Sequence, residues 1–383
     1  MTRNQSSILS FRIPAGTCGG YQIMASHSDS PTFKIKENPE MESEGHYIRL
    51  NVEKYGGMLC APWFDRPLSV AGRLVVKAGN CLVSKLVKVD RDLLMIPNLA
   101  IHFNRQVNDG YKYNPQVDMI PLFGGHDSKG TFMKLVADAA GVHEEDILGH
   151  DLFLYSRMPG TIWGAGNEFF SCGRIDDLQC AFASLKGFLE SEPAEGIAVH
   201  AVFDNEEVGS GTKQGADSTF LMDTLRRINT GLGRDEEAYL MALASSFMIS
   251  ADNAHAVHPN LPDRADPTNR PYMNQGIVIK YNANQKYTTD AVSAAMFKAL
   301  CQRAGVPFQT FANRSDMPGG STLGNISNAH VSLNTVDIGL PQLSMHSPYE
   351  TAGVMDTCYL TKVAAHFYSA CIRAGEGGCY EVV

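Results

Sequence analysis

Apolar and polar residues alternate with a period of two along much of the first part of the chain. This alternation predicts strands, and glycine-rich turns separate them. The predicted strands cover residues 7–13, 21–26, 47–55, 68–78, 81–89 and 151–157. One helix-like segment, residues 131–142, interrupts them. We therefore expect a β-rich unit between about residues 36 and 164.

From about residue 170 the pattern changes to helices that alternate with short apolar strands. Helices are predicted over 176–191, 217–230, 235–247, 290–305 and 356–374. Strands are predicted over 196–203, 246–252, 276–282 and 308–313, and within 334–347. Such alternation is typical of an α/β sandwich, in which helices cover a mostly parallel sheet. The expected fold class is α/β, with the β-rich unit inserted into it.

Composition excludes several classes of protein. With 383 residues, 44% hydrophobic and 19% charged, the chain has an ordinary globular composition, long enough for two domains. Its net charge of −9 argues against a nucleic-acid partner. No apolar window has the length of a membrane span, and the N-terminus has no apolar signal-peptide core. Nine scattered cysteines without a CxxC pair suit a reducing compartment, so we expect a cytoplasmic protein.

Five short segments place His, Asp or Glu at the edge of an apolar run. They are ASHSDSP (25–31), GRIDDL (173–178), DNEEVGS (204–210), SADNAHAVHPN (250–260) and LSMHSPYE (343–350). The ends of strands are where α/β sheets bind ligands. Histidine nitrogens and carboxylate oxygens together suit zinc, with manganese or cobalt as alternatives.

Each segment taken alone has a simpler explanation. A lone His or Asp at a strand end is more often a cap or a hydrogen-bonded core residue, and Asp177 could simply begin a helix. The spacing of His255 and His258 also fits a turn beside a ligand at Asp252, so neither histidine enters our ligand set.

Taken together and in this order, the segments resemble the co-catalytic dizinc aminopeptidases. Longer matches are similar to the aspartyl aminopeptidases of peptidase family M18. The similar segments are SHSDSP, YGG with WFDRPLSVAGR (55–57 and 63–73), IPNLAIHFNR (96–105), DNEEVGS, DNAHAVHPN, MPGGSTLG (317–324) and DIGLPQLSMHSPYE (337–350). The likeness extends from about residue 3 to about residue 370. It implies a three-layer α/β/α zinc-peptidase catalytic domain of residues 1–35 and 165–383, and an inserted β-rich dimerisation domain of residues 36–164.

The resemblance also implies a centre of two zinc ions per subunit. Its ligands would be His27, Asp176, Glu207, Asp252 and His346. Asp176 would bridge the two ions. His27 and Asp252 would hold one ion, and Glu207 and His346 the other.

Three further residues match catalytic positions of the family. Asp29 would orient the imidazole of His27, as carboxylates beside metal ligands do. Glu206 would be the general base. Tyr287, in NANQKY (282–287), would donate to the tetrahedral intermediate, although it could equally be a packing residue at a strand edge.

The substrate-binding positions implied by the resemblance are His102, Lys280, Gly319 and Gly320. Lys280 would meet an acidic substrate side chain, and the two glycines would let the backbone approach the substrate. His102 would reach the active site of a neighbouring subunit. The simpler alternatives are a solvated Lys280 at the end of its strand and a surface His102 within its own domain.

The resemblance implies a metalloaminopeptidase that removes N-terminal Asp or Glu from peptides with a zinc-activated water. The alternatives are a broad-specificity aminopeptidase or deacylase of the same clan, and a catalytically silent assembly protein. The family forms dimers that build a tetrahedral dodecamer. Three positions depart from its pattern, namely Ser28 for Thr, Asp177 for Asn and Tyr349 for Arg. Members of the family also have helices and a strand before the position of Arg3. We expect the lack of these elements to affect stability and assembly more than the metal site.

Overall fold

A computed structural model describes residues 1–16, 19–192, 195–375, 377 and 379–382. The chain divides into two compact units. The first comprises Met1–Ser30, Thr161–Met345 and Glu350–Val383, and the second comprises Pro31–Gly160 and His346–Tyr349. The sequence had placed the boundaries near residues 35 and 165. Two residues of the expected glycine-rich connection, Thr17 and Cys18, lie outside the described part.

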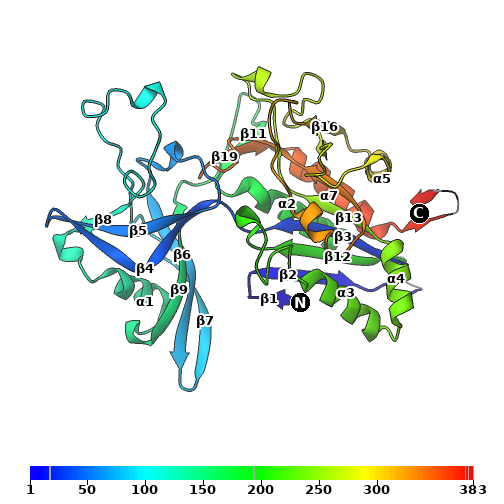
Figure 1. Cartoon of the computed structure of the whole chain (residues 1–383), viewed down its shortest axis with the longest axis horizontal. Coiled ribbons are helices and arrows are strands. Elements are labelled where there is room, and N and C mark those ends of the chain that lie inside the picture. Colours follow the sequence, from blue (N-terminus) through cyan, green and yellow to red (C-terminus); the bar gives the residue numbers. More distant parts are fainter. Residues whose placement is uncertain (17–18, 193–194, 376, 378, 383) are drawn as a thin grey trace. The chain divides into compact units, whose positions relative to one another are not determined.

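An eight-stranded sheet forms the centre of the first unit (Figure 1). In sheet order its strands are β1 (Thr2–Arg3), β2 (Ser7–Arg12), β12 (Ile197–Phe203), β3 (Tyr21–His27), β13 (Phe247–Ala251), β17 (Asn334–Gly339), β15 (Ile277–Tyr281) and β16 (Phe308–Ala312). The four inner strands β12, β3, β13 and β17 are parallel to one another. Their carboxyl ends therefore meet at one edge of the sheet.

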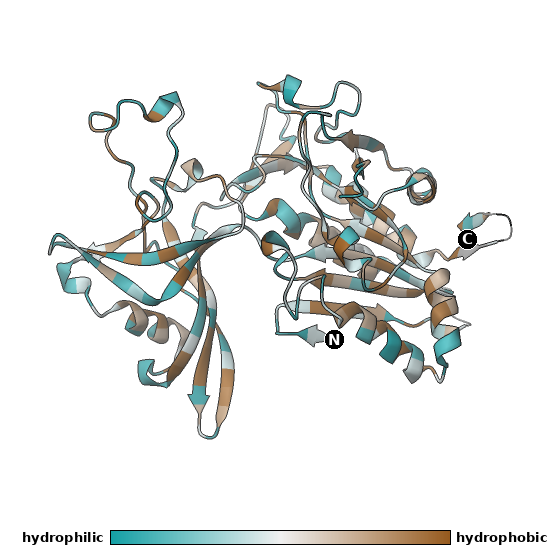
Figure 2. Ribbon diagram, in the orientation of Figure 1, coloured by the Kyte–Doolittle hydropathy of each residue, from teal (hydrophilic) through white to brown (hydrophobic). Residues whose placement is uncertain are grey.

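Helices cover both faces of this sheet. The helices of the first unit are α2 (Ile175–Glu190), α3 (Phe220–Gly231), α4 (Glu236–Ala244), α5 (Ala291–Ala304), α6 (Leu323–Ser327) and α7 (Asp356–Ser369). Apolar residues of α2, α5 and α7 pack in one core cluster, and those of α3, α4 and α6 in another. The inner strands are buried along nearly their whole length, and β12 and β13 are mostly apolar, as expected for strands covered on both faces (Figure 2). The predicted three-layer α/β fold is confirmed.

Local signals explain where several helices begin and end. Asp290 and Ser293 form a capping box at the start of α5, and Gly305 ends that helix in a left-handed conformation. The prediction for the last helix was wrong at its end. We expected a helix to residue 374, but α7 ends at Ser369 because the chain becomes extended at Ala370. Two short strands follow, β20 (Ile372–Ala374) and β21 (Tyr380–Val382).

A second, smaller sheet of the first unit has five strands. In order they are β10 (Thr161–Trp163), β11 (Phe169–Cys172), β19 (Glu350–Gly353), β18 (Pro341–Leu343) and β14 (Ala254–His255). Three of these strands begin or end beside segments singled out in the sequence. Strand β11 leads into the Asp176 segment, β14 follows Asp252, and β19 begins at Glu350. This sheet therefore anchors the segments that carry the candidate chemistry.

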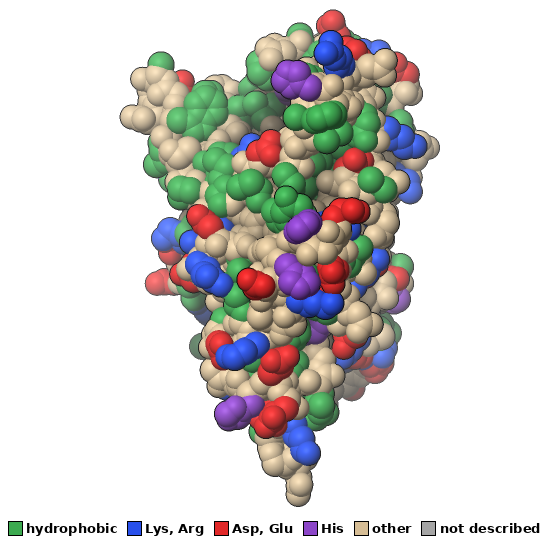
Figure 3. Space-filling view, turned by 90° about the vertical axis from the view of Figure 1, so that its left-hand side faces the viewer, with side chains coloured by type: hydrophobic (Ala, Val, Ile, Leu, Met, Phe, Trp, Pro, Cys, Tyr) green, Lys and Arg blue, Asp and Glu red, His purple; other side chains and the backbone are tan. Residues whose placement is uncertain are grey.

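The second unit is built on a six-stranded antiparallel sheet. Its strands, in order, are β7 (Cys81–Lys88), β6 (Leu68–Ala78), β9 (Ile147–Ser156), β4 (Thr32–Ser43), β5 (Tyr47–Tyr55) and β8 (Leu122–Gly125), and its helix is α1 (Phe132–Ala140). Leu82 and Leu86 on the edge strand β7 are exposed, as are Leu99, Phe103 and Val117 in the loop before β8. Hydrophobic side chains also gather in the upper part of the face shown in Figure 3. Exposed apolar groups of this kind are typical of association surfaces.

No helix in the described part of the chain is long and apolar enough to cross a bilayer. The cysteines among the described residues are free thiols.

Candidate metal centre

Three neighbouring parallel strands bring the candidate residues to one edge of the sheet. His27 is the last residue of β3 and lies opposite Phe203, the last residue of β12. Asp252 directly follows β13, whose Ser250 lies opposite Ala25 of β3. The same register places Asp252 level with His27. Segments far apart in the sequence therefore meet at this edge because the strands are parallel and in step.

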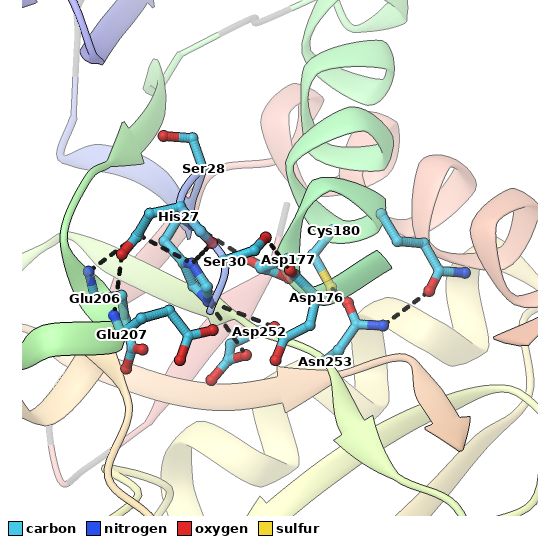
Figure 4. Close-up of polar contacts among 12 residues, drawn as sticks. His27, Ser28, Ser30, Asp176, Asp177, Cys180, Glu206, Glu207, Asp252 and Asn253 are labelled. Carbon is cyan, nitrogen blue, oxygen red and sulfur yellow. Dashed lines mark hydrogen bonds and ion pairs between the residues drawn. The ribbon is translucent and has the colours of Figure 1, made fainter. Parts of the chain in front are cut away.

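His27 lies at the centre of a buried group of carboxylates (Figure 4). Its Nε2 is 3.5 Å from Asp176 Oδ1 and 3.7 Å from Asp252 Oδ1. The exposed fractions of His27, Asp176 and Asp252 are 1%, 3% and 9%. Burial alone would lower the pKa of His27, but hydrogen bonding to the carboxylates of Asp176, Asp252 and Asp29 holds that pKa well above 6.5. Three acidic side chains around one imidazole create a site that attracts positive charge.

Asp176 is held by its own backbone at the start of α2. The residue before Ile175, Arg174, has a left-handed conformation, and the backbone angles of Asp176 and Asp177 are non-helical. The backbone N–H of Asp176 donates to Glu350 Oε2 at 3.0 Å. The carboxylate of Asp177 accepts a hydrogen bond of 3.1 Å from the backbone N–H of His27. Because of this irregular start, the two neighbouring carboxylates face different groups. Asp176 faces the His27 ring, and Asp177 faces the His27 backbone.

A tight turn after β12 presents both glutamates of the DNEEVGS segment. Asn205 has a φ of 63° and Gly209 a φ of 93°, and between them lies a single 3-10 turn, η5 (Glu206–Val208). Adjacent residues of a straight strand would point to opposite faces of the sheet. Because the strand has ended, ligand atoms of Glu206, Glu207 and His27 lie within 4.8 Å of one another.

Asp29 holds this turn in place. Its Oδ1 accepts from the backbone N–H of Glu206 at 3.0 Å, and its Oδ2 from that of Glu207 at 3.1 Å. Its backbone carbonyl lies 3.1 Å from His27 Nδ1, so Nε2 is the ring nitrogen that faces the carboxylates of Asp176 and Asp252. The sequence had indicated only an orienting role toward His27. The structure adds that the same residue contacts the histidine through its backbone carbonyl and holds both glutamates through its carboxylate.

Burial raises the pKa of Glu206 to about 7, and the neighbouring Asp252 carboxylate adds to the shift. A carboxyl group with a pKa near neutrality is suited to both accepting and giving up a proton.

Behind the cluster lies a buried network of amide and carboxyl side chains that sequence reasoning missed. Asn253, next to Asp252, donates to Gln179 Oε1 at 2.8 Å and to Gln342 Oε1 at 2.6 Å. Gln342 in turn donates to Glu350 Oε1 at 3.2 Å, and Glu350 receives the Asp176 N–H. The one signal in the sequence was a glutamine, Gln342, within an apolar strand just before SMHS (344–347). Only the fold shows that this glutamine lies beside the site.

Lys280 and Tyr287 lie beside the cluster. Lys280 Nζ is 3.4 Å from Asp252 Oδ2, and its ammonium lies 5.6 Å from the centre of the Tyr287 ring. Burial alone would lower the pKa of Lys280, but Asp252 raises it above its usual value. Tyr287 is 5% exposed and packs against Phe311. Lys280 is thus a buried cation paired with a candidate ligand, and not a solvated strand end.

The remaining predicted residues are placed as follows. Gly319 and Gly320 lie in the loop between β16 and α6. His102 lies exposed in a turn of the second unit. His346 belongs to the short segment grouped with that unit, where its Nδ1 lies 2.5 Å from the Gly57 carbonyl oxygen. The two histidines left out of the ligand set, His255 and His258, are exposed.

Comparison with known proteins identifies the family. A model of the family "Aminopeptidase I zinc metalloprotease (M18)" matches residues 1–368. The chain belongs to the M18 family of zinc aminopeptidases. It is 48% identical over 375 residues to a probable M18 family aminopeptidase 2 of Clostridium acetobutylicum, covering 96% of this chain and 87% of that protein.

Solved M18 structures have the same fold. A cryo-EM structure of a complex of Ape4 and Nbr1 matches with a TM-score of 0.92 at 35% identity, covering 96% of this chain and 75% of that one. A dodecamer of mApe1 from S. cerevisiae matches with a TM-score of 0.82 at 27% identity, covering 96% and 85%. As an M18 protein, the chain is a zinc aminopeptidase, a hydrolase.

The residues present fit the zinc that the M18 family implies. Donor atoms about 2.0–2.2 Å from a tetrahedral zinc ion lie roughly 3.3–3.6 Å apart. The separation of His27 Nε2 from Asp176 Oδ1, 3.5 Å, falls in this range, and its separation from Asp252 Oδ1, 3.7 Å, lies just above it. One imidazole nitrogen with carboxylate oxygens is also a donor set that zinc accepts. The oriented Nδ1 of His27 matches the way metal-binding histidines are usually fixed.

Proposed function

We propose that this M18 aminopeptidase holds two zinc ions and removes N-terminal Asp or Glu from peptides. The observation that carries the proposal is the convergence of His27, Asp176, Asp252, Glu206 and Glu207 at one sheet edge. His27 and Asp252 would hold one ion, and Asp176 would offer one oxygen to each ion. When bound, such a pair supplies Lewis-acid polarisation of the peptide carbonyl and lowers the pKa of water.

Glu207 and His346 complete the ligand set of the second ion in this proposal. His346 directly follows Met345 and comes four residues before Glu350, both of which belong to the first unit. The carbonyl oxygen of Gly57 near its Nδ1 supports Nε2 as the nitrogen that binds metal.

Glu206 is the general base of the proposed reaction. It shares the Asp29-held turn with Glu207, and its carboxylate lies close to His27. In this proposal it does not bind the metal. In this position it would take the proton of the attacking water and pass it to the leaving amine.

Tyr287 and Lys280 are assigned to the substrate. The phenol of Tyr287 would donate to the oxygen that becomes negative in the tetrahedral intermediate. Lys280 would attract the carboxylate of an N-terminal Asp or Glu side chain. An ammonium has three N–H donors, so its ion pair with Asp252 leaves capacity for a second carboxylate.

A substrate panel tests this proposal. The zinc-loaded protein is assayed with matched anilides of Asp, Glu, Leu and Lys, and kcat/KM is compared. We expect the Asp and Glu substrates to be hydrolysed at least about tenfold faster, because a buried lysine discriminates by charge. A preference for Leu would favour a broad-specificity aminopeptidase, and hydrolysis of none of them would favour the silent assembly protein.

We also infer that the chain self-associates, to dimers and then to a dodecamer. The dodecamer of mApe1 and the exposed apolar residues of β7 and of the loop before β8 support this inference. His102, exposed in that loop, would then act in the site of a neighbouring subunit. A peptide substrate and further copies of this chain are the partners we expect.

A further inference from the structure

A buried carboxylate that is not among the proposed ligands joins two loops. Asp337 lies in β17 and is completely buried. Its Oδ2 accepts from the backbone N–H and the hydroxyl of Thr288, at 2.5 and 2.6 Å. Its Oδ1 accepts from the hydroxyl of Thr322 at 2.7 Å. A carboxylate is an acceptor only, and three donors from two separate loops converge on this one.

Both loops carry residues assigned to the substrate. Thr288 directly follows Tyr287, and Thr322 follows Gly319 and Gly320 by two or three positions. The two attachment points are therefore next to the candidate oxyanion donor on one loop and next to the glycine-rich segment on the other.

The backbone of Asp337 strengthens the first attachment. Its N–H donates to Thr289 Oγ1 at 2.9 Å, and the Thr289 hydroxyl lies 3.4 Å from its carbonyl oxygen. Because Thr289 and Thr322 are both almost fully buried, their hydroxyls have few alternative partners. Loss of a partner for such a group costs more than the net stabilisation that one hydrogen bond contributes.

The packing leaves little freedom around these attachments. A Cβ at Gly324 would lie 2.9 Å from Asp337 Oδ1, and one at Gly319 would lie 2.6 Å from Asn313 Oδ1 and 3.3 Å from Asn282 Nδ2. Asn282 begins the Tyr287 loop, so the two loops also approach each other directly. A displacement of either loop would therefore be passed to the other.

We propose that Asp337 is a positioning residue, which sets Tyr287 and the glycine-rich loop in a fixed relation to each other. It acts through the hydrogen bonds to Thr288 and Thr322 and contacts neither metal nor substrate. The proposal rests on the role of Tyr287 proposed above.

Two substitutions of Asp337 separate geometry from charge. Asp337→Ala removes all three hydrogen bonds, and we expect kcat to fall about 100-fold, the cost typical of a misplacement of roughly 1 Å. In Asp337→Asn the amide oxygen can keep both bonds from Thr288, and its NH₂ can donate to the Thr322 hydroxyl. We expect this variant to stay within about threefold of wild type. An Asn variant as slow as the Ala variant would overturn the proposal in favour of a charge effect.

Thr322→Val is a milder change, because valine has almost the same shape as threonine and only the hydrogen bond to Asp337 is lost. We expect it to lower kcat by about tenfold in the wild-type background. In a Tyr287→Phe background it should lower kcat by no more than about twofold, because the effects of coupled residues are not additive. If the double variant loses the product of the two single-variant factors in kcat, the proposal is contradicted. The matched control is Thr224→Val, which removes an equally buried hydroxyl bonded to the Phe220 carbonyl in α3 and should leave kcat unchanged.

Limited proteolysis tests the same idea without activity. Lys286 is exposed next to Tyr287, and Arg314 lies at the start of the glycine-rich loop. Trypsin should cut after both residues several-fold faster in Asp337→Ala than in wild type or Thr224→Val. Equal cleavage rates would overturn the proposal. If instead cleavage rises but wild type hydrolyses none of the anilides, the proposed function fails and the positioning role stands.

Discussion

At the scale of single residues, Asp29 contacts three residues of the site at once, Glu206, Glu207 and His27. One short carboxylate accepts from two consecutive backbone N–H groups while its backbone faces His27. In Asp29→Asn an NH₂ group must face one of these N–H donors, so one hydrogen bond is lost. We expect zinc affinity, measured by competition with a chromophoric chelator, to fall roughly 10- to 100-fold.

The control for this substitution is Asp266→Asn. Asp266 also accepts from two backbone N–H groups, those of Thr268 and Asn269, but in the loop around 262–270. Equal zinc affinities in the Asp29 and Asp266 variants would contradict the role given to Asp29.

Single residues were predictable from the sequence only where the motif was local. The family resemblance implied an orienting role for Asp29 toward His27, only two residues away, and the two lie in contact. The bonds from Asp29 to the Glu206 turn join segments that are far apart in the chain, and no local pattern signals them. Asp337 was missed for the same reason, because its donors come from two other loops.

At the scale of elements, a buried histidine connects two helices to the sheet. His200 of β12 is 2% exposed, and its Nδ1 lies 2.9 Å from Ser184 Oγ of α2, which in turn lies 3.0 Å from the Tyr368 hydroxyl of α7. Burial lowers the pKa of His200 to about 4. The unfolded chain, with a pKa near 6.5, therefore binds this proton more readily than the folded protein does.

The sign of the pH dependence follows. The contribution of neutral His200 to stability is complete above about pH 6.5 and decreases as the pH falls toward 4. The loss amounts to about 2 kcal/mol at pH 5. The free energy of unfolding in urea, measured on the chelator-treated protein, should fall by this amount between pH 7.5 and 5. The His200→Gln variant should not show this contribution. The exposed His366→Gln should follow wild type. Parallel pH profiles for His200→Gln and wild type would contradict the account.

Elements were predictable where periodicity was clean. The inner strands and most helices were expected near their observed positions, because continuous apolar runs and 3.6-residue periodicity are strong signals. Strand β4 was not, since TFKIKENPEMES contains a proline and several charges, and its pairing with β5 shifts register between Ile35 and Glu40. The end of α7 was also missed, because no glycine or proline marks it at Ala370.

At the scale of the whole molecule, the proposed exchange of His102 between subunits predicts complementation. His102→Ala subunits would lack the contribution that they make to a neighbour, and Glu206→Gln subunits would lack their own base. We expect each homo-oligomer to be at least about 100-fold slower than wild type, as losses of catalytic groups usually are. Refolding an equal mixture should restore part of the activity, because a His102→Ala subunit keeps Glu206 and can receive His102 from a Glu206→Gln neighbour.

The control is a mixture of two oligomers that are not refolded together, which should stay inactive. An active monomer on gel filtration, or a refolded mixture no faster than its parts, would contradict the exchange. The sequence alone could suggest such an arrangement only through the family resemblance, because contacts between copies leave no periodic pattern in one chain.

The central claim is that Glu206 is the base of a zinc peptidase centre whose ligands lie around His27. It is tested most directly by measuring bound zinc and hydrolysis of an Asp anilide on the same samples of wild type and Glu206→Gln. Gln keeps the shape of the turn held by Asp29 but cannot accept the proton. The account predicts equal zinc content and a loss of kcat of at least about 100-fold. Retained turnover at equal zinc content would contradict it.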